Sequence, residues 1–166
     1  MIFPGVRNAV LGGVDTVEHA YNIDDETLGL IIEKGVFVVP TLRLTHANPT
    51  PSARNLYGVQ IESLRRAYEA GARIALGSDT GEERTPHGSG NAIEFRLMGE
   101  VMAPKDALMA GTSVVAQAMG LEADIGSIEP GKYADLVAVA EDPLKDLSAL
   151  EHVQFIMQGG RVITEP

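Results

Sequence analysis

Short apolar runs alternate with helical segments over residues 6–119, and this alternation constrains the fold more than any other feature of the chain. The short segment at residues 15–19 and the more apolar runs at residues 36–39 and 73–76 predict strands. The run at residues 36–39 is apolar throughout, as expected for a strand that is buried on both faces. Strands separated by helices favour βα units and a parallel sheet, so we expect an α/β protein.

Capping and helix-ending residues define the segments between the strands. We expect helices at residues 6–12, 53–70, 91–102, 104–110 and 112–119, and another that begins near residues 22–26 and ends at Gly35. Residues 46–52, which hold two prolines, and the glycine-rich residues 77–90 are expected to be loops.

The pattern changes after Gly120, because no helical period continues beyond it. Residues 133–140 and 152–157 predict strands, and Gly159 and Gly160 predict a tight turn into a further strand at residues 161–163. We therefore divide the chain into an α/β domain at residues 1–120 and a small β-rich segment at residues 121–166.

Length and composition limit the classes of fold and partner. With 166 residues the chain is too short for a closed (β/α)8 barrel, which needs about 200 residues. A formal charge of −10 argues against nucleic acid and against anionic membrane surfaces as partners. The absence of cysteine excludes disulfides and thiolate sites. No apolar run has the ~18 residues of a membrane span, and the first eight residues do not resemble a signal peptide, so we expect a cytoplasmic protein.

Two of the expected strands end in residues that can bind a metal ion. His19 ends the first strand and Asp79 follows the third. In parallel α/β barrels the active site lies at this end of the strands. An imidazole can bind zinc, and a carboxylate can bind a metal or act as general base on a water molecule. The alternative for His19 is a bond to the backbone, and for Asp79 it is an Asx-turn or a helix cap.

Two further residues are candidates for contacts with a substrate. His87 lies in the loop after Asp79, which would cover the same end of the sheet, and Arg43 follows the second strand, where it could meet an anionic group. A solvated loop histidine and a surface ion pair are the alternatives. Glu18 is a poor second ligand, because neighbouring residues of a strand point to opposite sides.

The motifs of the chain resemble the C-terminal part of metal-dependent hydrolases of the amidohydrolase superfamily, nearest the imidazolonepropionase-like and prolidase-like (Xaa-Pro or Xaa-Arg dipeptidase) branch. The resemblance rests on residues 12–19 (GGVDTVEH), 39–42 (VPTL), 75–80 (ALGSDT), 86–88 (PHG), 107–112 (ALMAGT) and 125–137 (IGSIEPGKYADLV). It covers nearly the whole chain, and the last motif is the most specific.

The resemblance implies a fold and a site. Residues 14–19, 36–41 and 73–78 would be strands six to eight of a TIM-type (β/α) barrel, and the tail would be the C-terminal part of a small β-sandwich. His19 would be the strand-six metal ligand. Asp79 would bind the metal and take a proton from the hydrolytic water, while His87 would lie beside the substrate. The cofactor would be a divalent metal, with zinc as the expected ion.

Several metal ligands of the superfamily have no counterpart in this sequence. The His-x-His pattern of strand one and the bridging lysine of strand four are absent, and Phe3 and Pro4 occupy the region of the strand-five histidine. A partial barrel also leaves open strand edges. We therefore expect a homo-oligomer, with elements exchanged between subunits or with a rearranged α/β fold, in which two copies could pool His19 and Asp79.

The sequence leaves three functions open. The leading one is a metal-dependent hydrolase of ester, amide or dipeptide bonds, truncated and of reduced activity. The second is a non-catalytic fragment that needs a partner chain with the missing barrel half. The third is a metal-free esterase that uses Ser78 or Ser89, although neither lies in a Gly-x-Ser-x-Gly motif.

Overall fold

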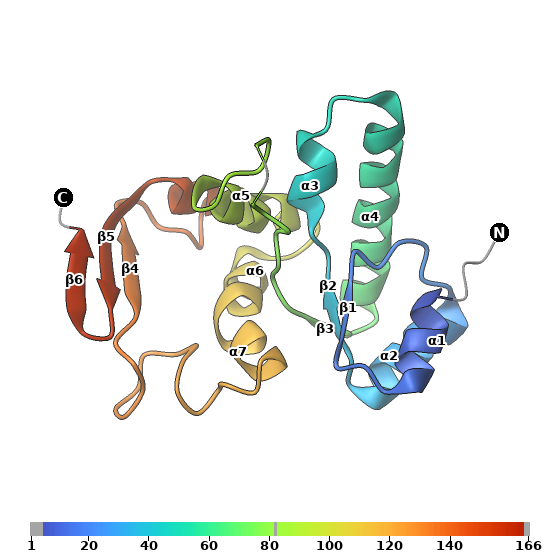
Figure 1. Cartoon of the computed structure of the whole chain (residues 1–166), viewed down its shortest axis with the longest axis horizontal. Coiled ribbons are helices and arrows are strands. Elements are labelled where there is room, and N and C mark those ends of the chain that lie inside the picture. The colour runs from blue at the N-terminus through green and yellow to red at the C-terminus, as the bar shows by residue number, and fades with distance from the viewer. Residues whose placement is uncertain (1–4, 82, 165–166) are drawn as a thin grey trace.

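Two three-stranded sheets and a set of helices make up the computed structural model, which describes residues 5–81 and 83–164. The helices are α1 (Gly5–Gly12), α2 (Asp25–Lys34), α3 (Leu42–Ala47), α4 (Pro51–Glu69), α5 (Ser89–Met98), α6 (Pro104–Met109), the π-helical turn η1 (Ala110–Val114), α7 (Val115–Ala118) and the 3-10 helix η2 (Leu147–Glu151). The strands are β1 (Thr16–Glu18), β2 (Phe37–Val39), β3 (Arg73–Ile74), β4 (Leu136–Val139), β5 (Val153–Gln158) and β6 (Arg161–Thr164). Figure 1 shows the first sheet among the helices and the second at the C-terminal end of the molecule.

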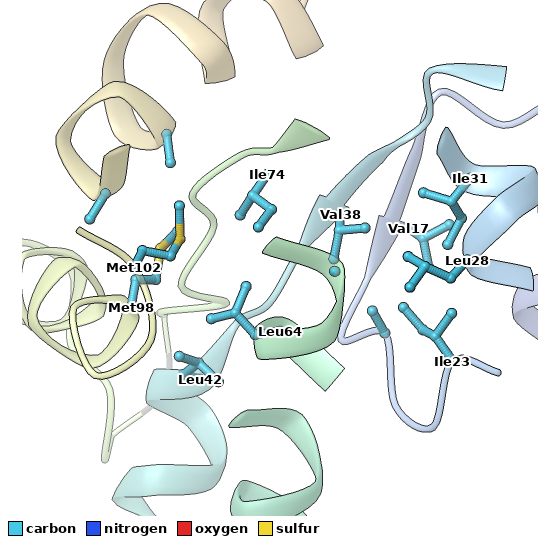
Figure 2. Close-up of a cluster of buried hydrophobic side chains, with 14 of the residues drawn as sticks. Val17, Ile23, Leu28, Ile31, Val38, Leu42, Leu64, Ile74, Met98 and Met102 are labelled. Atoms are coloured by element: carbon cyan, nitrogen blue, oxygen red, sulfur yellow. The ribbon is translucent and has the colours of Figure 1, made fainter. Parts of the chain in front are cut away.

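The first sheet is parallel, in the order β1-β2-β3, as the alternation of strands and helices predicts. Its register places Val38 opposite both Val17 and Ile74, so these three side chains share one face. All three are buried. Figure 2 shows this face among apolar side chains from α2 and α4, with Leu64 of α4 on the same side.

The opposite face of the parallel sheet is covered by the segment after α6. Phe37, Val39 and Ala75 are buried there and pack against Val114 and Val115. The continuous apolar character of residues 36–39 thus follows from burial of β2 on both faces.

Local capping explains how α2 begins and ends. The side chain of Asp24 accepts a hydrogen bond from the Thr27 amide (2.7 Å), and Gly35 ends the helix in the left-handed region with φ of 67°. A side-chain cap at the start and a left-handed glycine at the end are frequent helix boundaries, and the sequence predicted both.

Two helical segments differ from the sequence-based prediction. Residues 42–47 form α3, although the expected loop began at residue 46. Residues 104–118 form one helical run, because the π-helical turn η1 joins α6 to α7 where two separate helices were expected. The carbonyl of Ala110 accepts from the amide of Leu76 (3.0 Å), so it is engaged outside the helix at the point where the helix widens.

The second sheet is antiparallel, in the order β4-β5-β6, which agrees with the strands predicted for the tail. The carboxylate of Asp135 accepts from the Gly159 amide (2.6 Å) and so fixes the turn between β5 and β6. An ion pair between Arg96 and Glu151 (2.8 Å) joins α5 to η2, which lies between β4 and β5 in the chain. Among the described helices, none has both the length and the apolar character of a membrane span.

Candidate active site

His19 lies at the carboxyl end of the parallel sheet, directly after β1. Its amide donates to the carbonyl of Val39 (2.9 Å), which extends the pairing of β1 with β2. His19 and Ala20 have φ of 66° and 43°. Left-handed conformations cost energy for residues other than glycine, and such strain gathers at functional sites. In this turn the Nδ1 atom of His19 lies 2.6 Å from Oγ1 of Thr41, which follows β2.

Thr41 determines which ring nitrogen of His19 carries the proton. The Thr41 hydroxyl donates to the carbonyl of Pro40 (2.8 Å), so its single proton is engaged. When the hydroxyl proton is placed on Pro40 in this way, the Thr41 oxygen accepts from Nδ1 of His19. A neutral imidazole that donates from Nδ1 keeps a lone pair on Nε2, and this is the nitrogen left for a metal ion.

Tyr21 lies close to His19 and within electrostatic range of Asp79. Its ring stacks on the imidazole of His19, with 6.0 Å between ring centroids and 7° between the ring planes. The pKa of the Tyr21 hydroxyl is raised, chiefly by burial and also by the negative charge of Asp79. Asp79 is exposed and has φ of 50° after β3. His19, Tyr21 and Asp79 therefore share one end of the sheet.

A polar network holds the loop at residues 77–90 over this end. Thr80 donates to the side-chain oxygen of Asn91 (2.5 Å), and its oxygen lies 3.3 Å from Nδ1 of His87. His87 is exposed. A surface pocket of about 360 Å³, lined by Leu44, Asp79, Thr80 and Gly81, opens beside the loop. The larger pocket of about 500 Å³ lies around residues 34–37 and 117–120, at the amino end of the strands, and contains none of the candidate site residues.

Arg43 lies in the first turn of α3 and contacts the same loop. Its Nη2 donates to the carbonyl of Arg84 (3.2 Å). Its Nε is buried and has no hydrogen-bond partner among the described residues. Arg43 thus supports the loop that carries His87, and it places a positive charge beneath that loop.

Glu94 of α5 is fully buried behind this region. Its two carboxylate oxygens accept from the amides of Leu42 (2.8 Å) and Arg43 (2.7 Å), at the start of α3. Burial raises the pKa of Glu94 to about 7, although the two amides and the charge of Arg43 act in the opposite direction. No sequence motif predicted this contact.

His19 and Asp79 are residue types that bind metal ions, but two ligands are too few for a metal site. His19 offers a free Nε2, and Asp79 offers an exposed carboxylate. Within residues 5–81 and 83–164, however, no group of three or more His, Asp or Glu residues is close enough to hold a metal ion. A catalytic zinc site has three protein ligands and a water molecule. The described residues therefore supply two donors of a site that needs more.

Comparison with known proteins identifies the family. The model of the amidohydrolase family matches residues 5–164. The chain belongs to the amidohydrolase family. Family members depend in general on divalent metals, and the mixed α/β fold of this chain matches their solved structures.

Three relatives show how far the similarity to other amidohydrolases extends. A crystal structure of a Xaa-Pro dipeptidase with methionine in its active site superposes with a TM-score of 0.85 at 32% identity, over 96% of this chain and 42% of the dipeptidase. The ochratoxinase of Aspergillus niger is 26% identical over 98% of this chain and 36% of its own length, and its crystal structure gives a TM-score of 0.84. The imidazolonepropionase of Symbiobacterium thermophilum is 34% identical over 80% of this chain and 29% of its own length. The chain thus spans less than half the length of each relative.

Sequence reasoning assigned no role to three residues of this region. Thr41 lay within a recognised motif, but only its contact with Nδ1 of His19 reveals a role. Tyr21 lies two residues after His19, and this short separation in the chain could have indicated that the two rings lie close together. Glu94 shares the helical spacing of Leu97 and Met98, both buried, which could have marked it as a buried carboxylate.

Proposed function

We propose that this chain carries part of the active site of a metal-dependent hydrolase that cleaves amide bonds in small, dipeptide-like substrates. The observation that carries the proposal is the bond from Nδ1 of His19 to Thr41, because it leaves Nε2 available at the sheet end that also holds Asp79. The similarity to a Xaa-Pro dipeptidase supports the choice of substrate class.

The proposed roles follow from the placement of each residue. His19, through Nε2, and Asp79, through its carboxylate, would hold a divalent ion, with zinc as the expected ion. When bound, the ion would lower the pKa of a water molecule and polarise the scissile bond. Asp79 would accept the proton of the attacking water. His87 and Arg43 would contact the substrate from the loop and from the start of α3. An ester bond is easier to cleave than an amide and makes a suitable second substrate class.

We further propose that β1, β2 and β3 correspond to strands six to eight of a (β/α) barrel, within a domain at residues 1–120. Residues 121–166 would form the C-terminal part of a small β-sandwich. Support comes from the parallel order of the three strands and from the superposition on 42% of the Xaa-Pro dipeptidase.

A homo-oligomer is the proposed source of further ligands. Among the described strands, β1 and β3 are the two edges of the parallel sheet, and each pairs on one side only. Two copies that pair or exchange elements could bring two His19 and two Asp79 side chains to one interface. A partner chain with complementary barrel strands is the alternative, in which case this chain alone is inactive.

The contacts of Ser78 do not favour the metal-free esterase. Its hydroxyl bonds to Thr80 and to Asn91, each at 3.2 Å, and neither residue is a base. Ser89 is exposed at the start of α5. A serine nucleophile needs a base within hydrogen-bond reach.

Metal analysis combined with light scattering tests the proposal. We expect a defined oligomer with stoichiometric divalent metal, and hydrolysis of dipeptides or esters that depends on the metal. His19→Ala and Asp79→Asn should lower metal affinity more than about 100-fold, since changes outside the ligands alone cost 10–100-fold. His152→Ala and Asp15→Asn are matched controls, because both residues are exposed, His152 lies beside the second sheet, and Asp15 lies at the opposite end of the strands. A metal-free, inactive chain would refute the homo-oligomeric hydrolase and favour the non-catalytic fragment that needs a partner chain.

A further inference from the structure

A buried carboxylate, which the proposed hydrolytic chemistry does not use, accepts from the amide of Leu42, the residue after the Thr41 partner of His19. Glu94 is 0% exposed, and both of its oxygens are engaged by backbone amides that lie 52 and 51 residues earlier in the chain. A buried charge is costly unless strong hydrogen bonds compensate it, so this contact constrains both segments.

Glu94 replaces the local cap that α3 lacks. The first amides of a helix have no partner within the helix, and a side chain at the N-cap position usually accepts from them. Thr41 occupies that position in α3 but makes no such bond. Its hydroxyl is turned instead toward Pro40 and His19. The amides of Leu42 and Arg43 are satisfied by Glu94, which frees Thr41 to contact the imidazole.

The conformation of Thr41 is held from both sides. Its φ of 50° is unfavourable for a β-branched residue, so the surrounding contacts must maintain it. Before Thr41, Gln60 of α4 donates to the carbonyl of Pro40 (3.1 Å). After Thr41, Glu94 holds the amides, and the fully buried side chain of Leu42 lies in the core beside Leu64 (Figure 2).

We propose that Glu94 is a positioning residue for His19. It acts indirectly, because it holds the start of α3 and thereby Thr41, which contacts the imidazole. Its carboxylate fixes the amides of Leu42 and Arg43, and this fixes Thr41 in the conformation whose oxygen accepts from Nδ1 of His19. The result is an imidazole that presents an unprotonated Nε2 at the sheet end of Asp79. The inference builds on the proposed role of His19 as a metal ligand, but the geometry that it describes exists without the metal.

The tautomer of His19 in the metal-free protein is the direct measurement. Nitrogen NMR of the labelled imidazole at alkaline pH distinguishes the two neutral tautomers. We expect the Nδ1–H form to predominate in the wild type. In Glu94→Gln one carboxylate oxygen becomes an NH2 group that cannot accept from an amide. The Nδ1–H form should then decline to a mixture of tautomers, and the amide signals of Leu42 and Arg43 should shift.

Matched variants separate positioning from general disturbance. Glu33→Gln, at an exposed position of α2, should leave the tautomer unchanged. Thr41→Val removes the accepting oxygen and should reproduce the effect of Glu94→Gln, whereas Thr41→Ser retains a hydroxyl and should restore the Nδ1–H form. An unchanged tautomer in Glu94→Gln would overturn the proposal.

Hydrogen exchange in the wild type gives a test that needs no variant, in case Glu94→Gln does not fold. Amides of a first helical turn lack helical partners and ordinarily exchange fast. We expect those of Leu42 and Arg43 to be protected at the level of the buried strands, and free exchange would refute the role of Glu94. Neither readout uses metal or substrate. A failure of the proposed hydrolase would therefore appear as missing metal or activity with the Nδ1–H form intact.

Discussion

At Glu94, burial and hydrogen bonding act in opposite directions on a single carboxylate. Burial favours its protonated form and raises the pKa to about 7 from an ordinary value of 4.5. The amides of Leu42 and Arg43 and the guanidinium of Arg43 favour the charged form. Tyr57 of α4 also lies near Glu94, and its pKa is raised chiefly by burial and by Glu100, with a smaller contribution from the charge of Glu94. The folded state thus binds the proton of Glu94 more tightly than the unfolded chain does.

The raised pKa of Glu94 can be detected as a pH-dependent difference in stability between the wild type and Glu94→Gln. A pKa that is raised on folding adds stability that is fully present below pH 4.5 and is lost as the pH rises toward 7. We expect the unfolding free energy of the wild type, minus that of Glu94→Gln, to fall by about 3 kcal/mol over this range and to level off above it. Denaturant titrations of both proteins at several pH values measure this difference in unfolding free energy. A difference that stays constant with pH would contradict the raised pKa.

At the scale of elements, two glycines have opposite structural roles. Gly58 lies in the middle of α4, and a Cβ atom added there would contact nothing within 4 Å. Gly77 follows β3, and a Cβ atom there would lie 2.5 Å from Cγ1 of Val39. The first glycine therefore only weakens a helix, while the second allows two strands to approach closely.

Alanine at each glycine tests this distinction. Gly58→Ala should stabilise the protein by about 1 kcal/mol, because alanine restricts the unfolded chain and favours the helix. Gly77→Ala should destabilise it by about 1–3 kcal/mol, because the added Cβ atom would clash with the Val39 side chain, which must shift within its packed surroundings. Thermal and denaturant unfolding of the pair measures both effects. Equal changes in the two variants would show that the close approach at Gly77 is unimportant.

For the whole molecule, the connection between the two sheets runs through α5 and η2. Leu147 of η2 is buried and belongs to the main core cluster, close to Gly99 after α5. The ion pair of Arg96 with Glu151 lies beside it but is partly exposed, so it contributes little. The apolar contacts of Leu147 and Leu150 with the core cluster therefore attach this segment to the helices more strongly than the ion pair does.

Removal of the Leu147 side chain should loosen the second sheet. We expect Leu147→Ala to cost about 2–5 kcal/mol and to increase hydrogen exchange in β4 and β5. Leu144→Ala, at a position that is 55% exposed in the same segment, is the control and should change stability by less than about 0.5 kcal/mol. Equal effects of the two substitutions would argue against an attachment at Leu147.

Local sequence patterns determined the elements and the family of this protein. The alternation of apolar runs and helical segments predicted the parallel α/β arrangement, and Gly35 and the glycine pair at residues 159–160 marked boundaries that the structure has. The motifs predicted membership of the amidohydrolase family, which the family model confirms. These features depend on residues close together in the chain, so a single sequence reveals them. The assignment of His19 and Asp79 as metal ligands stays a prediction.

Only the tertiary structure decided how the candidate site is supported. The bond of Thr41 to His19 spans 22 residues, and the bonds of Glu94 to the start of α3 span about 50. The same distant cap stabilises the start of α3, for which Thr41 supplies no side-chain cap of its own. Contacts of this kind leave no periodic signal, because neither partner is unusual within its own segment. They arise when packing of α5 against α3 brings a buried carboxylate to unsatisfied amides, which must be hydrogen-bonded once water is excluded.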